Sequence, residues 1–218
     1  MTELLTRRAS LLRFGGLLAA VATGGWWKVR PSAGAAAVAC VLTPEQTEGP
    51  YYIPNERVRR NITDGHPGTP LTLRLAVVDA ATCRPIKGAA VDVWHADALG
   101  VYSGVQGNTG TFMRGIQRTD AKGLAVFRTV YPGWYRGRTV HIHVKVHVGG
   151  SVVHTGQLYF RDTLTDAVYR KAPYSKRPNR DTRNATDPIF GSGGRRSMLT
   201  VRRHGAGYTG SIRMGVSR

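Results

Sequence analysis

The sequence predicts an all-β fold, a sandwich of mainly antiparallel strands with long loops and one short helix. Two observations lead to this prediction. Short stretches in which apolar and polar residues alternate recur along the chain, and clusters of Gly, Pro, Asn and Asp separate them. A helical pattern is convincing only over residues 163–169, with Thr163 or Thr165 as the N-cap. The 218 residues suffice for one domain with a sizeable core.

The strands are expected in order along the chain. Their predicted ranges are 71–79, 89–97, 112–118, 124–130, 141–148, 152–160, 198–204 and 208–216. Residues 42–52 should form an extended arm, because Pro44 and Pro50 exclude a helix there. Gly149 and Gly150 suit a tight hairpin turn, and residues 205–207 suit another between the last two strands. The stretches 100–111 and 173–194 are expected to be loops, the second polar and rich in helix-breaking residues.

The amino terminus has the pattern of an export signal. Arg7 and Arg8 precede Ala-Ser-Leu-Leu, which resembles a twin-arginine signal. The apolar stretch 14–27 is glycine-rich and shorter than the about 20 residues that span a bilayer. Residues 33–39 then offer several A-x-A cleavage sites. We therefore expect a signal segment over residues 1–39 and a domain over 40–218, in the periplasm, outside the cell or at its surface; the alternative is an uncleaved membrane anchor.

The two cysteines fit an oxidising compartment. Cys40 and Cys83 form an even pair, and exported proteins use such pairs as disulfides. We expect a disulfide that ties the mature amino terminus to the domain. Two unpaired buried thiols, or a lipid-modified Cys40, are the alternatives.

The net charge of +18 raises nucleic acid as a partner. However, the Lys and Arg residues are scattered, and no helix-turn-helix, zinc-finger or RNP-like pattern accompanies them. We therefore expect a solvated basic surface and no nucleic-acid binding. An anionic aromatic substrate could also be attracted by such a charge.

The strand over residues 141–148 carries a candidate metal site. His141 and His143 alternate with Ile142 and Val144, so the two imidazoles project from one face, about 7 Å apart at the Cα atoms. At that separation they can bind one metal ion. The alternative is a half-buried strand with a polar face toward water. A cupin is not indicated, because the next acidic residue is Asp162.

Five motifs in order resemble the intradiol ring-cleavage dioxygenases, of which catechol 1,2-dioxygenase and protocatechuate 3,4-dioxygenase are familiar members. They are Glu48-Gly-Pro-Tyr-Tyr52, the stretch from Val93-Trp94-His95 to Tyr102, Tyr131-Pro132, Arg138-Thr-Val-His141-Ile-His143, and Gly156-Gln157-Leu-Tyr-Phe160. The resemblance covers about residues 42–160. It implies cleavage of a catechol-type ring by O2 to a cis,cis-muconate-type diacid.

The resemblance also implies a cofactor and a set of ligands. The family uses non-haem Fe(III), held by two tyrosinates and two histidines, and the motifs place these at Tyr102, Tyr131, His141 and His143. Oxygen anions suit a hard ferric ion and imidazole also suits iron. The residue at the Tyr131 position would leave the metal and help take a proton.

Other site residues follow from the same motifs. Arg138 would stabilise negative charge on the substrate ring, and Gln157 would lie near the substrate. Tyr51, Tyr52 and Trp134 are candidates for the pocket lining. Trp94 is more readily interpreted as a core residue than as part of the pocket lining. Neither His95 nor His147 is expected to bind metal. Taken without the resemblance, each of these residues could equally be a packing or surface residue.

Two alternatives to an enzyme remain at this point. One is a non-catalytic exported sandwich that binds an aromatic compound or a cell-surface polymer, and the other is a structural surface domain. Neither requires two tyrosines and two histidines in this order. The preferred catechol and the oligomeric state are left open, because the arm before residue 71 is shorter than in the familiar enzymes, as is the loop before His141.

Overall fold

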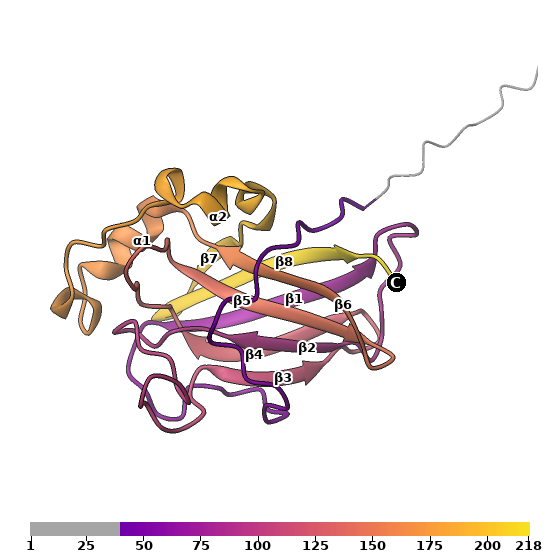
Figure 1. The fold of residues 1–218 in the computed structure, drawn as a ribbon, viewed down its shortest axis with the longest axis horizontal. Coiled ribbons are helices and arrows are strands. Elements are labelled where there is room, and N and C mark those ends of the chain that lie inside the picture. Colours follow the sequence, from indigo (N-terminus) through magenta and orange to yellow (C-terminus); the bar gives the residue numbers. More distant parts are fainter. Residues whose placement is uncertain (1–39) are drawn as a thin grey trace, which may run out of the picture. The chain divides into compact units, whose positions relative to one another are not determined.

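The computed structural model describes residues 40–218, which form two four-stranded sheets packed face to face (Figure 1). The predicted export signal over residues 1–39 lies outside the described residues. One sheet has the strand order β4 (Leu124–Val130), β1 (Pro70–Asp79), β8 (Gly207–Val216) and β7 (Thr200–His204); the other has β3 (Arg114–Arg118), β2 (Ala90–Trp94), β5 (His141–Val148) and β6 (Ser151–Tyr159). The predicted all-β sandwich is therefore confirmed.

Strand pairing is antiparallel except between the first strand and the last. β8 runs parallel to β1, with Leu71 opposite Tyr208 and Asp79 opposite Val216. This pairing places the closing β7–β8 hairpin at the edge of the first sheet. The hairpin itself was predicted, whereas its parallel contact with β1 was not.

The core lies between the two sheets. Leu71, Leu73 and Leu75 of β1 are fully buried there, as are Ile142 and Val144 of β5. Because side chains alternate along a strand, the histidines of β5 lie on the opposite, outer face of their sheet. The hydrophobic core thus fixes which face of β5 presents the candidate site.

The amino-terminal arm covers that outer face. The amide of Gln46 donates to the carbonyl of Thr155 on β6 over 3.0 Å, and the side chain of Gln157 donates to the carbonyl of Thr47 over 3.0 Å. Gly49 lies against His143: a Cβ added at Gly49, whose φ is +72°, would be 3.3 Å from His143 Cε1. In Figure 1 the arm crosses the sheet that contains β5 and β6. A disulfide joins Cys40 to Cys83, the pair expected from the sequence, and holds the start of the arm.

Helices cluster in the segment between β6 and β7. Helix α1 spans Asp162–Tyr169, close to the predicted range, but its N-cap is Arg161 and neither threonine takes that place. Residues 173–194, expected to be a loop, contain 3₁₀ turns and the short helix α2 (Pro188–Gly191). The sequence predicted one helix, whereas the structure has two in this segment. Asp187 and Pro188 begin α2 with an N-cap and an N1 proline, which is a recognisable helix start.

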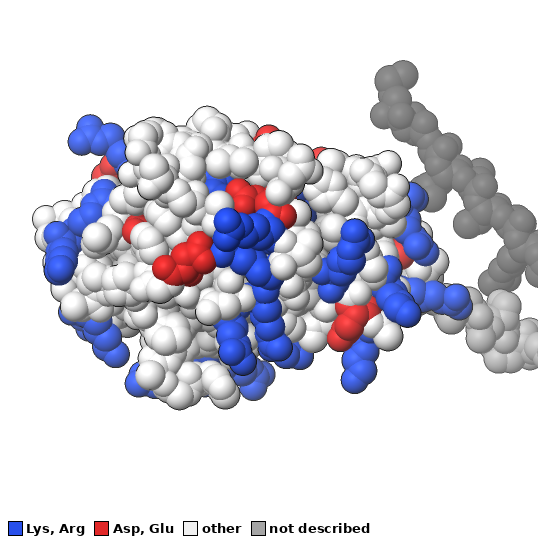
Figure 2. Space-filling model, turned by 90° about the horizontal axis from the view of Figure 1, so that it is seen from below, with Lys and Arg blue, Asp and Glu red and all other residues white. Residues whose placement is uncertain are grey.

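Basic side chains are common on the surface of the described part (Figure 2). Figure 2 shows Lys and Arg side chains spread over the face in view, with a few acidic side chains between them. No helix within residues 40–218 is both long and apolar enough to cross a membrane.

Candidate active site

Two imidazoles converge on the outer face of β5. The Nε2 atoms of His141 and His143 are 3.0 Å apart. Nδ1 of His141 lies 2.7 Å from the carbonyl oxygen of Thr139. Because a carbonyl can only accept, Nδ1 carries the proton and Nε2 keeps its lone pair. Trp94 stacks on His143, with ring centroids 4.9 Å apart and planes within 8°, and so fixes the second ring.

Two phenols join the imidazoles. The hydroxyl of Tyr135 is 3.1 Å from His141 Nε2, and the Tyr135 ring meets Tyr102 edge-on at 5.6 Å. The hydroxyl of Tyr102 is buried and has no hydrogen-bond partner among residues 40–218. Burial raises the pKa of both tyrosines, and the Arg138 guanidinium opposes that rise.

A buried arginine fixes the loop that carries Tyr102. The guanidinium of Arg114 donates to the carbonyl oxygen of Ser103 over 2.8 Å and to that of Tyr51 over 2.7 Å. It therefore ties the loop after β2 to the amino-terminal arm. The same contact brings the ring of Tyr51 to 4.7 Å from that of Tyr102.

The prediction that Tyr131 belongs to this group was wrong. Its hydroxyl hydrogen-bonds Thr165 Oγ1 at 2.7 Å, and its ring packs on Phe160 at 4.4 Å within the core between the sheets. The reason is strand alternation: Phe127 on β4 points into the core, and Tyr131 follows it by an even number of residues. That periodicity was readable from the sequence. Tyr135, four residues later, occupies the place beside His141 that was assigned to Tyr131.

Arg138 is held from two sides. Its Nε donates to Asp187 Oδ2 over 2.9 Å and its Nη2 donates to Gln157 Oε1 over 2.5 Å. Gln157 also accepts from the hydroxyl of Tyr159 at 3.0 Å. The structure thus brings Arg138 and Gln157 together, as the sequence predicted for two site residues.

Asp187 lies beside Arg138 at this site, and its place there was not predicted from the sequence. Its side chain is fully buried; one oxygen accepts from Arg138 and the amide of Thr139, the other from the amides of Ile189 and Phe190. Burial alone would raise the pKa of Asp187, but the Thr139 amide and the Arg138 charge outweigh it and lower the pKa. Asp187 was missed because residues 173–194 were read as a surface loop, although Asp before Pro signals a helix start.

Of the remaining residues predicted to line the pocket, two lie at the site and one does not. Tyr51 packs on Tyr102, and Tyr52 packs on Trp94 at 4.8 Å. Trp134 was predicted to line the pocket, but its indole donates to the carbonyl oxygen of Arg177 and its ring lies under that guanidinium, so it is turned toward the α1–β7 segment. Trp94, read as core, is indeed buried: it belongs to a small hydrophobic cluster with Ala96 and Tyr102 and stacks on His143 on the outer face of the sheet.

The other histidines lie apart from the pair. His95 points to the opposite face of β2, where its Nε2 is 2.8 Å from Thr129 Oγ1. His147 lies further along β5 and is partly exposed. Within residues 40–218, no third His, Cys, Asp or Glu joins His141 and His143 as a metal-binding group. The other donor atoms at the pair are the phenol oxygens.

This donor set fits a hard trivalent cation. Two imidazole nitrogens converge at 3.0 Å, and a buried phenol without a hydrogen bond lies beside them. Buried polar atoms are normally paired, and a bound cation would satisfy these atoms together. It would also reverse the raised pKa of each phenol and favour the phenolate.

Acid should destabilise the fold between pH 6.5 and pH 4.5. Burial lowers the pKa of five histidines: to about 4 for His95 and His154, to about 3 for His141, well below the ordinary value for His143, and below it also for His147. In this window the unfolded chain binds their protons and the folded chain does not, so the free energy of unfolding falls as the pH falls. Asp92, with its pKa raised by burial to about 7, and Glu56, also raised, act in the opposite sense but are fewer. Urea unfolding at constant ionic strength tests this; a midpoint that stays level or rises on acidification would contradict it.

Comparison with known proteins agrees with the geometry. A family model described as "Dioxygenase" matches residues 47–173. An intradiol ring-cleavage dioxygenase from Tetranychus urticae is 34% identical, with a TM-score of 0.78 over 82% of this chain and 95% of that one. The chain therefore belongs to the intradiol ring-cleavage dioxygenase family.

Curated relatives match over shorter stretches. Chlorocatechol 1,2-dioxygenase of Pseudomonas putida is 31% identical over 137 residues, which is 52% of each chain. Catechol 1,2-dioxygenase 2 of Acinetobacter lwoffii is 37% identical over 102 residues, covering 43% of this chain and 35% of the relative. The match to each spans about half the length of the relative or less.

Proposed function

We propose that the protein is an Fe(III)-dependent dioxygenase that cleaves a catechol-type ring between its two hydroxyl-bearing carbons. The observation that carries the proposal is the cluster of His141, His143, Tyr102 and Tyr135 on the outer sheet face. Family membership supports the reaction class. The substrates are a small aromatic diol and O2, and both oxygen atoms enter a muconate-type diacid.

The four converging side chains would hold the iron. When bound, the iron would supply Lewis acidity, which favours the deprotonated form of the diol. Deprotonated phenols favour the ferric state, because anionic oxygen suits a hard ion. Thr139 and Trp94 contribute by fixing the orientation of the two imidazoles.

Proton transfer falls to Tyr135. Its hydroxyl lies at the imidazole pair, 3.1 Å from His141 Nε2, on a loop between two glycines, Gly133 and Gly137. A phenolate there can accept the proton of a diol hydroxyl and become the neutral phenol that burial favours. The role that the sequence analysis gave to Tyr131 thus passes to Tyr135.

Arg138 supplies positive charge beside the substrate ring. Asp187 and Gln157 hold its Nε and Nη2, so the guanidinium is oriented before substrate arrives. Preoriented charge of this kind stabilises anionic character that develops on a ring during reaction. Tyr51 and the arm residues around Gly49 exclude water from the same face.

Product analysis under ¹⁸O₂ tests the reaction. The purified protein, iron-loaded and given catechol, should form a cis,cis-muconate that carries one ¹⁸O atom in each new carboxyl group, before any exchange with water. A ring-opened product that keeps one original hydroxyl beside an aldehyde would indicate cleavage outside the diol and contradict the proposal. Catechol bound without turnover would favour a non-catalytic aromatic-binding module.

We also propose that the protein is exported by the twin-arginine route. The Arg7-Arg8 motif and the Cys40–Cys83 disulfide support this, since disulfides persist in oxidising compartments. Replacing the pair by lysines (R7K/R8K) should leave the protein inside the cell, with both cysteines reactive toward a thiol reagent. A matched R57K/R60K variant should be exported normally. Equal export of the two variants would contradict the proposed route.

A further inference from the structure

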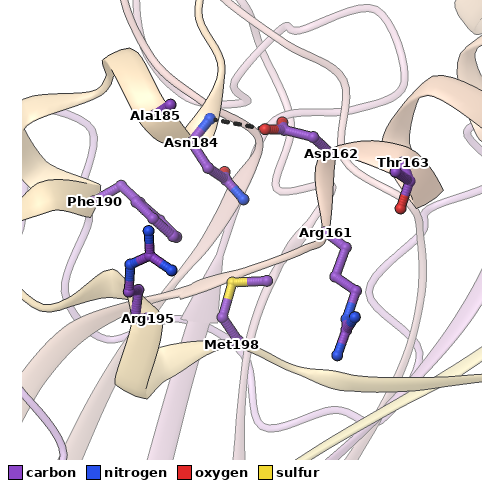
Figure 3. Close-up of a pocket in the computed structure, with 8 residues that line it drawn as sticks. All are labelled: Arg161, Asp162, Thr163, Asn184, Ala185, Phe190, Arg195 and Met198. Carbon is purple, nitrogen blue, oxygen red and sulfur yellow. Dashed lines mark hydrogen bonds between the residues drawn. The ribbon is translucent and has the colours of Figure 1, made fainter.

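A second concave surface lies beside α1 and α2, away from the paired histidines. Three adjoining cavities of about 490, 380 and 680 Å³ share Arg195, and two of them share Arg161 and Met198. Figure 3 shows Arg161 and Arg195 on opposite sides of the first cavity, with Met198 between them and Phe190 beside Arg195. The proposed catalytic chemistry uses none of these four residues.

The two arginines of this cavity are exposed to solvent and have no acidic partner among the described residues. Neither Arg161 nor Arg195 has a hydrogen bond or ion pair from its guanidinium within residues 40–218. The one carboxylate in the lining, Asp162, is already occupied: Arg180 donates to one oxygen over 2.7 Å and the Asn184 amide to the other over 3.2 Å. Two guanidinium groups are thus left for a ligand.

The end of α1 adds to this positive potential. Helix α1 begins after Arg161 without a side-chain cap, and Thr163 of its first turn lines the cavity. A helix amino terminus carries partial positive charge and amide donors. The partial positive charge at this helix end has the same sign as the two arginines, so both attract an anion.

The rest of the lining is apolar. Phe190 is buried, Met198 is half-buried, and Leu164 and Leu199 line the adjoining cavity. An inorganic anion would leave this surface in contact with water. An apolar body attached to an anionic head would satisfy both parts.

We propose that this cavity, lined by Arg161, Arg195, Phe190 and Met198, binds an organic monocarboxylate with an aromatic or alkyl body. The carboxylate binds both guanidinium groups, because paired N–H donors match its two oxygens. The apolar body covers Phe190 and Met198. The proposal is independent of ring cleavage, although Asn184, which lines the cavity, also accepts a hydrogen bond from Thr139 Oγ1 over 2.6 Å, beside Arg138.

Calorimetric titration with 3-phenylpropionate tests the proposal. The wild-type protein should bind it saturably, and at least about tenfold more tightly than the neutral 3-phenylpropan-1-ol, because charge-assisted hydrogen bonds are lost in the alcohol. R161Q/R195Q should weaken carboxylate binding about tenfold or more. A185W should also weaken binding, since Ala185 is exposed at the rim and a large side chain there fills the cavity without removing a charge.

Two controls separate this cavity from general charge and from the catalytic site. R74Q/R128Q removes two exposed arginines from β1 and β4 and should change affinity by less than about twofold, as expected for distant screened charges. Y135F should bind 3-phenylpropionate like the wild type even where it loses iron and activity. Absence of saturable binding, equal affinity in R161Q/R195Q, or loss of binding in Y135F would overturn the proposal.

Discussion

Tyr135→Phe is expected to lower turnover of catechol by about 10²-fold or more, the usual contribution of a placed acid or base. The variant should also lose much of the visible absorption of iron-bound phenolate, because one of two phenol oxygens at the imidazoles is gone. The reason is geometric: the Tyr135 hydroxyl is 3.1 Å from His141 Nε2. Turnover, iron content and the visible spectrum measure the effect.

Tyr131→Phe is the matched control. It also removes one phenol oxygen from the same loop region, but that oxygen bonds Thr165 in the core. We expect a loss of about 1 kcal/mol in the free energy of unfolding, the usual value of one hydrogen bond, with iron content and spectrum unchanged. Loss of iron in Tyr131→Phe with retention in Tyr135→Phe would reverse the assignment.

Asp187→Asn is expected to lower kcat by about 10²-fold while iron content stays at the wild-type level. The charge that orients Arg138 disappears. If the oxygen of the new side chain still caps α2, its NH2 group replaces the oxygen that accepts from Arg138 Nε and the Thr139 amide. Asparagine is as good an N-cap as aspartate, so α2 should persist. Steady-state kinetics with iron quantified in each sample measures the effect.

A double-variant cycle tests whether Asp187 acts through Arg138. In the R138Q background, Asp187→Asn should lower kcat little further, because the guanidinium that Asp187 positions is already absent. Asp181→Asn is the control, since Asp181 is exposed and accepts from the amide of Gly137 in the same loop and from the hydroxyl of Thr182, but not from Arg138. Full additivity of D187N and R138Q, or an equal loss in Asp181→Asn, would contradict the positioning role.

Strand alternation explains which parts of the fold could be predicted. β4 matches its predicted range, and the β5–β6 hairpin follows from Gly149 and Gly150. The parallel pairing of β8 with β1 joins residues more than 120 positions apart, and no local pattern indicates it. Helix α2 was not predicted because four residues are too few to show a helical period, although Asp187-Pro188 is a pattern typical of a helix start.

The site was predicted where the residues share a strand and misassigned where a loop intervenes. His141 and His143 meet because alternation places them on one face, and Gln157 lies opposite His143 on β6. Tyr131 and Tyr135 flank a Pro-Gly turn, and a motif match does not state which of them crosses to the outer face. Counting from Phe127 assigns Tyr131 to the core. The role of Asp187 depends on a contact across 49 residues and needed the structure.

The visible absorption spectrum of the purified protein tests the proposed site most directly. It should be recorded with iron quantified, before and after catechol is added without oxygen. Iron held by Tyr102, Tyr135, His141 and His143 predicts a red-brown phenolate-to-iron band that moves to longer wavelength when catechol binds. An iron-reconstituted protein that remains colourless would contradict the four-residue assignment and the proposed enzyme with it.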